Sequence, residues 1–352
     1  MRPGAGRVRD GDAGTPGRRR ARTGPTPGRE VHVRVRALVC TLVVAVALTG
    51  CANAAAAPRR WHEGRLFLAT GNTSGTFYQL GGGYADLVST YLPGYEVRAE
   101  PSGASGDNVD RLASGDMELA LCSGDTAADA AEGRGPYAGK PQPIRALARL
   151  YRNTMNVVVR TDAKIRKVAD LRGRRVSTGT LNSSTDLLAG RMLEAAGLNP
   201  DTDIQRLRTS LPDTVNGMRA GSVDALFFTG GLPTPGITDL LDSAPGKFAL
   251  LPAGDVVEPL AAKYGSVYSK ATISKDVYHT EADVEAIVLP TLLLVPADMP
   301  DDLAYNLTKV LFEHQAELAK VHPEGANFDR ASGAQTQPVP LHPGARRYYQ
   351  GR

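Results

Sequence analysis

Short apolar runs and helix-like patterns alternate along the chain from about residue 64 to its end. The apolar runs have the lengths typical of buried strands and lie at 66–69, 95–99, 117–122, 144–151, 155–160, 223–228 and 287–295. Between them, apolar residues recur three or four positions apart, which predicts helices over 77–91, 108–113, 187–196 and 213–220. This alternation favours an α/β fold with a mostly parallel sheet.

Helix ends are expected where capping residues and glycines occur. The segment 168–173 reads as a short helix closed by Gly173, and Asp213 is expected to cap a helix that stops at Gly221. Asp301 and Asp302 are expected to begin one long last helix, which has the pattern of core packing. Its apolar face would contain Leu303, Leu307, Val310, Leu311, Ala316 and Leu318.

A second folding unit is expected to begin near Thr161, and the chain would later return to the first unit. This path gives two lobes joined by a hinge. We predict that residues 64–160 and about 275–352 form lobe 1, that about 161–274 form lobe 2, and that 52–63 form a short tether. The roughly 290 residues involved are enough for one large or two medium domains.

The first 51 residues have the composition of a segment that directs export. Residues 1–30 are rich in Arg, Gly and Pro and have no apolar periodicity, so no packed structure is expected there. Translation could instead begin near Val31 or Val33. The apolar run at 37–48, which follows two arginines, is shorter than the roughly twenty residues of a membrane span and is typical of a secretory signal.

This signal ends in Leu48-Thr49-Gly50-Cys51, which resembles the lipobox of bacterial lipoproteins. The resemblance implies that Cys51 becomes the lipidated first residue of the mature protein. The protein would then be held at the outer face of the cell membrane. An ordinary signal peptide cleaved at another position is the alternative.

Removal of the signal changes the charge of the protein. The whole chain has 41 Lys and Arg against 37 Asp and Glu, but the first 51 residues hold ten arginines and only three acidic residues. The mature part therefore carries 31 basic and 34 acidic residues, a net charge of −3. The basic character belongs to the removed segment, so it gives no support for nucleic-acid binding.

Residues for metal-dependent or nucleophilic catalysis do not occur at the required spacings. The six histidines are scattered, with no pair at metal-ligand spacing. Cys40 lies in the signal, Cys51 would take the lipid, and Cys122 is expected to fill a buried strand position. Carboxylates are plentiful, but no pair is placed for acid–base work. We therefore predict a protein that is not an enzyme and has no cofactor or metal.

Two segments with the same pattern, 70–78 and 177–185, indicate a ligand site. Each follows an apolar strand, is rich in small polar residues and leads into a helix. Such a loop offers unpaired backbone N–H groups, hydroxyl groups and the positive end of a helix dipole. Together these can hold a small anion. One such loop alone would most simply be a helix cap, but two, one in each lobe, predict a cleft that contacts a ligand from both sides.

Further small polar loops follow strands at 101–108, 122–126 and 229–236. In open α/β sheets, ligands lie beyond the carboxyl ends of the strands, where such loops gather. Asp107 and Asp125 could instead only cap their helices.

Four other side chains are open to two interpretations. Phe77 is more typical of the core, whereas Tyr78 could line either a pocket or the core. Arg149 and Arg152 lie near the expected lobe junction, where they could counter a ligand carboxylate or could simply be solvated.

In their order and spacing, these segments resemble one family, the TAXI-type extracytoplasmic solute-binding proteins of TRAP transporters. The resemblance covers about residues 66–349, and the segments that carry it are 70–82, 105–108, 112–121, 170–176, 221–225 and 339–345. It implies a two-lobed periplasmic-binding-protein fold of type II with a central cleft. It also implies capture of a small organic anion, such as glutamate or another carboxylate, for delivery to a membrane permease.

The site residues that the loops and the resemblance indicate are mostly small and able to hydrogen-bond. They are Asn72, Thr73, Ser74, Gly75, Thr76, Tyr78, Ser105, Asn108, Ser123, Asp125, Asn182, Ser183, Ser184, Thr185, Gly230, Gly231 and Pro233. Where the family usually has Gly-Ser-Gly-Thr, this chain has Asn182-Ser183-Ser184-Thr185. A Ser at a Gly position adds bulk next to the ligand, so the identity of the ligand does not carry over.

We therefore expect a lipid-anchored, extracytoplasmic and monomeric receptor that binds a small organic anion and passes it to a TRAP permease, with no nucleic-acid partner. A ligand-sensing lipoprotein that feeds a signalling system would have the same sequence features. A surface-anchored hydrolase is a third alternative, for which no catalytic pattern is present.

Overall fold

The computed structural model describes residues 61–265 and 267–352 of the chain. The predicted signal peptide, the lipobox with Cys51 and most of the predicted tether lie outside the described residues. Within the described ranges, no helix has the length and apolar character that crossing a membrane requires.

Strands and helices alternate through most of the described chain, as the sequence pattern predicts. The strands are β1 (Arg65–Ala69), β2 (Glu96–Glu100), β3 (Leu119–Ser123), β4 (Ile144–Arg160), β5 (Arg175–Ser177), β6 (Gln205–Leu207), β7 (Ala225–Gly230), β8 (Phe248–Leu250), β9 (Ser269–Ile273) and β10 (Val284–Pro296). The α-helices are α2 (Thr76–Tyr91), α3 (Ser105–Ser114), α4 (Gly124–Glu132), α5 (Ser184–Ala195), α6 (Leu211–Ala220), α7 (Pro235–Ser243), α8 (Val257–Tyr264), α9 (Lys275–Tyr278), α10 (Asp301–Glu313), α11 (Gln315–Val321), α12 (Arg330–Gly333) and α13 (Pro343–Gln350). Short 3₁₀ helices lie at η1 (Trp61–Gly64), η2 (Gly135–Tyr137), η3 (Thr161–Ala163), η4 (Val168–Leu171), η5 (Gly254–Val256) and η6 (Pro323–Asn327).

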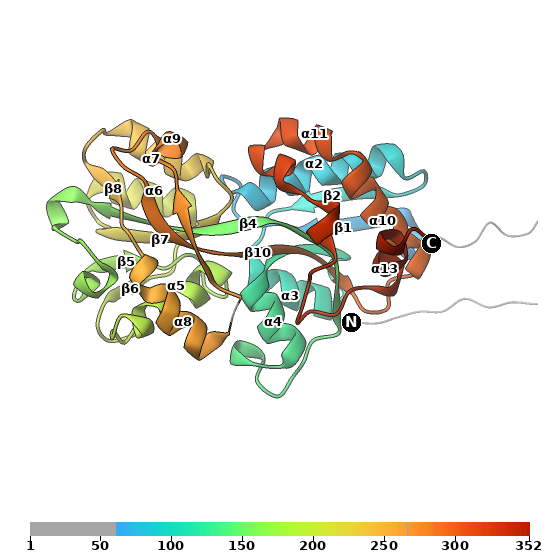
Figure 1. Cartoon of the computed structure of the whole chain (residues 1–352), viewed down its shortest axis with the longest axis horizontal. Helices are drawn as coiled ribbons and strands as arrows, with labels where there is room; N and C mark the ends of the chain where they lie inside the picture. The colour runs from blue at the N-terminus through green and yellow to red at the C-terminus, as the bar shows by residue number, and fades with distance from the viewer. Residues whose placement is uncertain (1–60, 266) are drawn as a thin grey trace, which may run out of the picture. The chain divides into compact units, whose positions relative to one another are not determined.

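The strands form one sheet in the order β2-β1-β3-β10-β4-β7-β5-β6, with β8 beside β4 and β9 beside β10 (Figure 1). β1 pairs in parallel with β2 and β3, and β5 pairs in parallel with β6 and β7. The long strands β4 and β10 run antiparallel to each other and to their neighbours β7 and β3. The sheet is therefore mixed rather than mostly parallel, because the two strands that join its halves run against the strands beside them.

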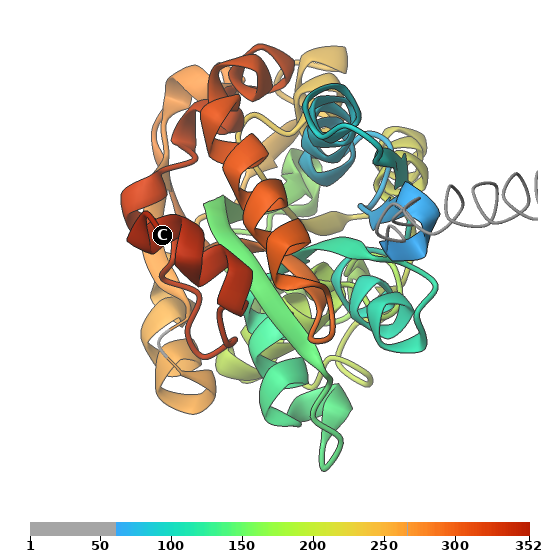
Figure 2. The same ribbon diagram turned by 90° about the vertical axis from the view of Figure 1, so that its right-hand side faces the viewer.

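In the first half of the sheet, alternate strand residues enter two different cores. Leu68 and Leu121 pack with α2 and α10 on one face, whereas Ala69 and Cys122 pack with α3 and α4 on the other. This alternation follows from the two-residue period of a strand. Figure 2 faces this half and shows its helices on either side of the sheet. Cys122 is a buried free cysteine in β3, as predicted.

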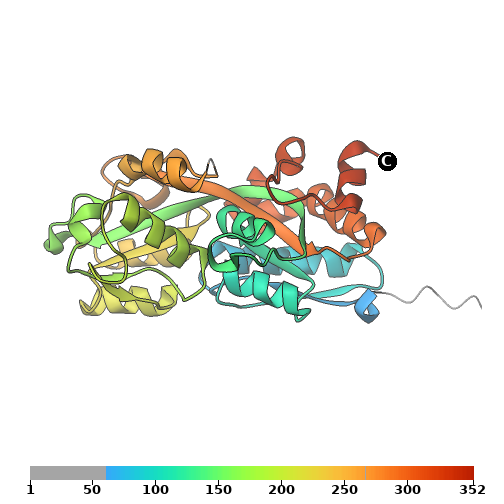
Figure 3. The same ribbon diagram turned by 90° about the horizontal axis from the view of Figure 1, so that it is seen from below.

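The second half repeats the arrangement with its own two cores. Val157 and Phe227 pack with α5 and α8, and Val158 and Leu226 pack with α6 and α7 on the opposite face. Seen from below, the helices of this half again lie on both sides of the strands (Figure 3). Each half therefore has helix–sheet–helix layers, and the two halves share β4 and β10.

Along both β4 and β10, the residues at one end pack in a first-half core and those at the other end pack in a second-half core. In β4 the change falls between Tyr151, in a first-half core, and Met155, in a second-half core. In β10 it falls between Leu289 and Leu292. We call residues 152–154 of β4 and 290–291 of β10 the crossing segment. The predicted residue limits of the two lobes stay a prediction.

β4 is a single strand, although the sequence predicts two strands, at 144–151 and 155–160. The polar residues between these apolar runs, Arg152, Asn153 and Thr154, pair with β10. Because backbone pairing does not depend on the polarity of the side chain, the ladder continues where the apolar pattern stops.

The predicted last long helix is two helices. α10 ends at Glu313, α11 begins at Gln315, and His314 between them has a non-helical backbone with φ −112°. Leu303 and Leu318 are buried as expected, but Ala316 is exposed. The break at His314 turns the second helix, so the apolar period predicted from the first does not continue through it.

The start of α6 also differs from the prediction, because Ser210 caps this helix instead of Asp213. Ser210 Oγ accepts a hydrogen bond from the backbone N–H of Asp213 at 3.3 Å and donates one to its carboxylate at 2.6 Å. The helix therefore begins at Leu211, earlier than predicted.

Candidate functional site

A cavity lies between the two halves, where loops that follow β1, β2, β5, β6 and β7 meet. Its volume is about 30 Å³, which is space for roughly two water molecules. From the first half it is lined by Gly71, Asn72, Gly75, Thr76, Phe77 and Ala104. From the second half it is lined by Gly179, Thr180, Ser183, Ser184, Thr185, Thr209, Leu211, Thr214, Phe227, Phe228, Thr229 and Gly230. The cavity thus lies at the carboxyl ends of parallel strands, where α/β sheets place their ligands.

Both predicted helix starts reach this cavity. α2 begins at Thr76 after the N-cap Gly75, and α5 begins at Ser184 after the N-cap Ser183. The backbone N–H groups of the first two residues of each helix have no acceptor within the described part of the chain. A helix cannot satisfy these N–H groups internally. Each half therefore presents two free donors and the positive end of a helix dipole to the same space.

Eight Ser and Thr hydroxyl groups line the cavity, and no charged side chain is among its described lining residues. Ser183 Oγ caps α5 by accepting a hydrogen bond from the Asp186 N–H at 3.1 Å. Thr185 Oγ1 accepts one from the Thr229 N–H at 3.1 Å, which ties the start of α5 to the end of β7. The apolar part of the wall is formed by Phe77, Phe227 and Phe228. The cavity can therefore satisfy an anion with neutral donors, without a side-chain cation.

Seven of the predicted site residues line the cavity. They are Asn72, Gly75, Thr76, Ser183, Ser184, Thr185 and Gly230. That they bind a ligand stays a prediction. The other ten predicted residues lie outside the lining, where they hold loops, join the two halves or face away.

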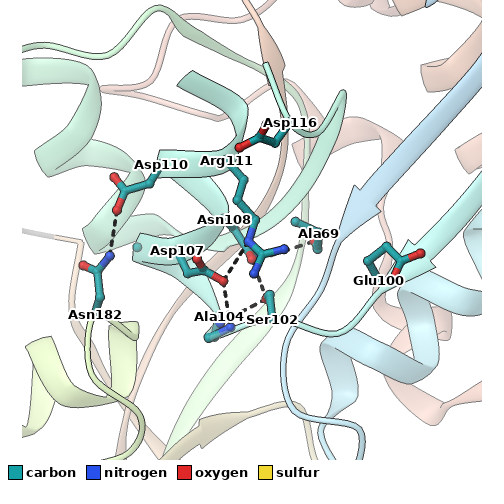
Figure 4. A network of polar contacts seen from close by, with 12 residues as sticks. Ala69, Glu100, Ser102, Ala104, Asp107, Asn108, Asp110, Arg111, Asp116 and Asn182 are labelled. Carbon is teal, nitrogen blue, oxygen red and sulfur yellow. Dashed lines mark hydrogen bonds and ion pairs between the residues drawn. The ribbon is translucent and has the colours of Figure 1, made fainter. Parts of the chain in front are cut away.

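Three of these ten, Ser105, Asn108 and Ser123, hold the first-half loops together. The buried Asn108 amide donates to the carbonyls of Thr70 and Leu121, both at 2.7 Å. Ser105 Oγ accepts a hydrogen bond from the Ser123 N–H at 3.0 Å. Figure 4 shows two further partners of Asn108: the Ser102 hydroxyl group, which donates to its side-chain oxygen, and the Ala69 carbonyl, which accepts from its amide. The Asn108 and Ser105 side chains thus position the strand ends, whereas the Ser123 hydroxyl group lies 2.9 Å from the Ser184 hydroxyl group and so joins the two halves.

Asn182 joins the two halves instead of facing the cavity. Its carbonyl accepts a hydrogen bond from the Gly106 N–H at 2.9 Å, and its amide donates to Asp110 at 2.8 Å (Figure 4). A Cβ at Gly106 would lie 2.2 Å from the Asn182 carbonyl oxygen, so only glycine allows this approach. Asn182 has φ +63°, a backbone region that Asn adopts more readily than most residues.

Gly231 and Pro233 form a second contact between the halves. The Gly231 N–H donates to Thr76 Oγ1 at 3.1 Å. The Pro233 carbonyl accepts a hydrogen bond from Nε2 of His322 at 3.0 Å. Burial lowers the pKa of His322, which favours the neutral ring that donates through Nε2. The first turn of α2 is therefore held against the loop after β7.

The middle of the first predicted loop, Thr73 and Ser74, does not line the cavity. Thr73 is exposed, and Tyr78 is half-buried. Ser74 Oγ is buried and has no hydrogen-bond partner within the described residues. Asn72, at the start of the loop, contacts the other half, because its side-chain oxygen accepts a hydrogen bond from the Leu211 N–H at 3.2 Å.

Asp125 lies in a buried polar cluster that also joins the halves. The Tyr268 hydroxyl donates to Asp125 at 3.1 Å, and Arg191 donates to Tyr268 at 2.7 Å and to Asp129 at 2.5 Å. Burial raises the pKa of Asp125 to about 6, although the nearby Arg191 guanidinium opposes this shift. The N-cap of α4 is Ser123, so Asp125 does not cap this helix.

Eleven lining residues are not among the predicted site residues. For some of them, the sequence pattern could have indicated a place in the site. Thr180 lies within the predicted loop 177–185, and Thr229 directly precedes the predicted Gly230. Phe77 was expected in the core and both packs there and lines the cavity. Leu211 and Thr209 lie in a stretch that resembles any other turn, so nothing local marks them. Neither Arg149 nor Arg152 lines the cavity.

Within residues 61–265 and 267–352, no group of three His, Cys, Asp or Glu residues is placed to hold a metal ion. Thr76 Oγ1 lies 3.5 Å from Nε2 of His322, but this nitrogen donates to the Pro233 carbonyl, so it is not available as a base for the hydroxyl group. The arrangement is suited to binding by hydrogen bonds rather than to covalent chemistry.

Comparison with known proteins places these features in a family. Residues 68–351 match the NMT1-like family. The chain belongs to the NMT1-like family. The sequence resemblance to TAXI-type proteins is a finer assignment that this match does not include.

Solved binding proteins resemble this NMT1-like chain in fold. The binding protein of a phosphonate ABC transporter from Pseudomonas aeruginosa superposes with a TM-score of 0.53 at 12% identity, over 82% of this chain and 87% of that one. PhnD1 from Prochlorococcus marinus, solved with methylphosphonate, gives a TM-score of 0.53 at 12% identity, over 79% and 96%. The shared fold is that of the two-lobed periplasmic binding proteins, as predicted. Family and neighbours agree with the prediction that the chain is not an enzyme.

Because Gly106 lies so close to Asn182, we predict that a methyl group added at position 106 holds the two halves apart. We expect Gly106→Ala to shift the protein toward a more open form, because the added Cβ would overlap the Asn182 carbonyl. Small-angle X-ray scattering should show a larger radius of gyration than in the wild type. Gly82→Ala is the matched control, since a Cβ there meets nothing within 4 Å, and it should leave the radius unchanged. Identical scattering from Gly106→Ala and the wild type would show that the contact does not limit closure.

The raised pKa of Asp125 predicts that the stability of the protein depends on pH. Its folded pKa, about 6, lies above the ordinary value of 3.8, so the folded state binds this proton more tightly than the unfolded state. Stability should therefore fall as the pH rises from 4 to 7, by up to about 3 kcal/mol from this group. Urea unfolding of the wild type and Asp125→Asn at both pH values measures the effect. A difference between the two proteins that stays constant with pH would contradict the assignment.

Proposed function

We propose that this protein is an extracytoplasmic solute receptor that binds a small organic anion between its two lobes and delivers it to a membrane transporter. It acts by binding alone and performs no chemistry on the solute. The NMT1-like family and the shared fold of periplasmic binding proteins support this function.

The observation that carries the proposal is the meeting of two helix starts in one cavity. Free N–H groups of α2 and α5 approach the same space from opposite halves. An anion between them gains charge-assisted hydrogen bonds from both sides, so it favours the closed arrangement of the lobes. Without such donors, a buried carboxylate would cost several kcal/mol.

The phenylalanine walls indicate an anionic group attached to an apolar body, since they offer contact area without hydrogen bonds. Carboxylates are the class we propose, with glutamate-like acids among them. A cavity of about 30 Å³ requires the lobes to separate before a solute of several heavy atoms enters, so we propose a hinge motion at the crossing segment.

We further propose that the transporter is of the TRAP type and that the receptor is a TAXI-type lipoprotein anchored through Cys51. The loop order along residues 66–349 and the segment 48–51 support this. Labelled palmitate should appear in the wild type and be absent from Cys51→Ser, which should also leave the membrane fraction. Unchanged labelling of Cys51→Ser would disprove the lipid anchor and leave the binding function untouched.

The role of the helix N–H groups can be tested separately from that of the hydroxyl groups. Proline is tolerated at the first position of a helix, and Ser183 before it already has the extended backbone that proline requires, φ −86° and ψ 158°. Ser184→Pro therefore removes one N–H donor from the start of α5 and keeps the helix. Ser184→Ala removes the same hydroxyl group but keeps the N–H, which makes it the matched control.

A thermal-shift screen of amino acids, dicarboxylates and keto acids identifies the tightest-binding solute, and calorimetry then measures its affinity. We expect Ser184→Pro to bind about ten- to a hundredfold more weakly than Ser184→Ala, because a hydrogen bond to a charged group is lost. Equal affinities in the two variants would count against anion binding at this helix start.

A further inference from the structure

A second hollow region lies outside the interlobe cavity, along the crossing segment. Two adjoining grooves of about 470 and 590 Å³ share four lining residues, Arg149, Arg152, Val288 and Gln335. None of these four lines the interlobe cavity. We call the pair of grooves the crossing groove. It is formed by β4 and β10 together with the chain around α12.

Most charged side chains of the crossing groove are already paired. Arg191 pairs with Asp129, Arg134 with Glu132, and Lys270 with Glu285. The buried Glu324 accepts hydrogen bonds from the Leu232 N–H and from Asn327. The charges within the three ion pairs neutralise one another, whereas Glu324 is held by neutral donors and has no cationic partner among the described residues.

Arg149 and Arg152 are the exceptions. Neither guanidinium has a carboxylate within 4.0 Å or a hydrogen-bond acceptor within the described residues. Arg152 is exposed and Arg149 is half-buried in the groove wall. Each offers five N–H donors in a planar fork that matches oxyanions, so two such forks line the same grooves.

A bulge in the sheet places both side chains in the same groove. Residues three apart on a regular strand point to opposite faces. Here Arg152 pairs with Pro290 and Arg149 pairs with Leu292, so two residues of β4 between them lie opposite one residue of β10. The extra residue reverses the alternation between them, and both guanidinium groups line the crossing groove. This bulge lies where the core changes from one half to the other.

We propose that Arg149 and Arg152 form a second binding site, separate from the interlobe cavity, for a small dianion such as a dicarboxylate or a phosphate. Two forks on one groove wall match two negative charges better than one. The groove volumes suit a molecule of several heavy atoms. A dianion held by both arginines bridges the bulge, so it links residues on either side of the crossing segment.

This position gives the site a regulatory consequence. If closure of the lobes changes the bulge, a dianion there prefers one state over the other. Dianion binding and solute binding in the cavity then change each other's affinity by the same factor. The crossing groove site does not depend on the proposed function, because it uses none of the cavity residues.

Calorimetric titration with succinate and with inorganic phosphate tests the site, with acetate as the singly charged comparison at equal ionic strength. Arg149→Gln/Arg152→Gln should bind both dianions at least about tenfold more weakly than the wild type. The control Arg346→Gln removes an exposed charge on α13 and should bind them like the wild type. Thermal unfolding of all variants confirms that each is folded.

The cavity variant Ser184→Pro separates the two anion sites. It should keep the binding that the arginine variant loses, even if the cavity solute is never identified. The proposal is overturned if the arginine variant binds both dianions like the wild type, or if Arg346→Gln loses as much affinity. It is also overturned if acetate binds as tightly as succinate, or if only Ser184→Pro loses dianion binding, which would place the anion in the cavity.

Discussion

The continuous pairing of β4 with β10 is the constraint on which the rest of the structure depends. At 17 and 13 residues, these strands are long enough to serve both halves, since a strand rises about 3.3 Å per residue. Their backbone pairing with each other and with β3 and β7 sets the positions of the strands in both halves. The loops that begin α2 and α5 start from the ends of strands in these halves, so the pairing brings the two helix starts to one cavity.

The cavity and the crossing groove offer different kinds of donor to a negatively charged ligand. In the cavity, neutral donors from backbone and hydroxyl groups converge on a small enclosed space, where the desolvation of an arginine would be costly. In the groove, Arg152 is exposed and Arg149 is half-buried, so their guanidinium groups lose less hydration than they would in the cavity. The first arrangement favours a fully buried group, and the second favours a ligand that keeps part of its hydration.

Local patterns predicted the presence of these helices, because capping and loop chemistry act over a few residues. α2 and α10 start within one residue of their predictions, whereas α3, α5 and α6 start two or three residues earlier than predicted. The loops that lead into α2 and α5 and the buried position of Cys122 followed from residues 66–78, 119–122 and 175–187. The direction of β4 and β10 was not predictable in this way, since apolar runs look alike in parallel and antiparallel strands. The roles of Asn108 and Asn182 were not predictable for another reason: small polar residues at strand ends can bind a ligand or bind the neighbouring loop. Only their three-dimensional partners distinguish the two roles.

The burial of Cys122 has a consequence for the extracytoplasmic role that we propose. Its side chain is fully covered within the first-half core, and this burial raises the pKa of the thiol. Thiolate is the form that reacts with oxidants and with other disulfides, so this sulfur is protected where unpaired thiols are normally at risk. The described part of the folded domain therefore has no exposed thiol that could form a wrong disulfide bond in oxidising surroundings. Its folding does not need a disulfide isomerase for this cysteine.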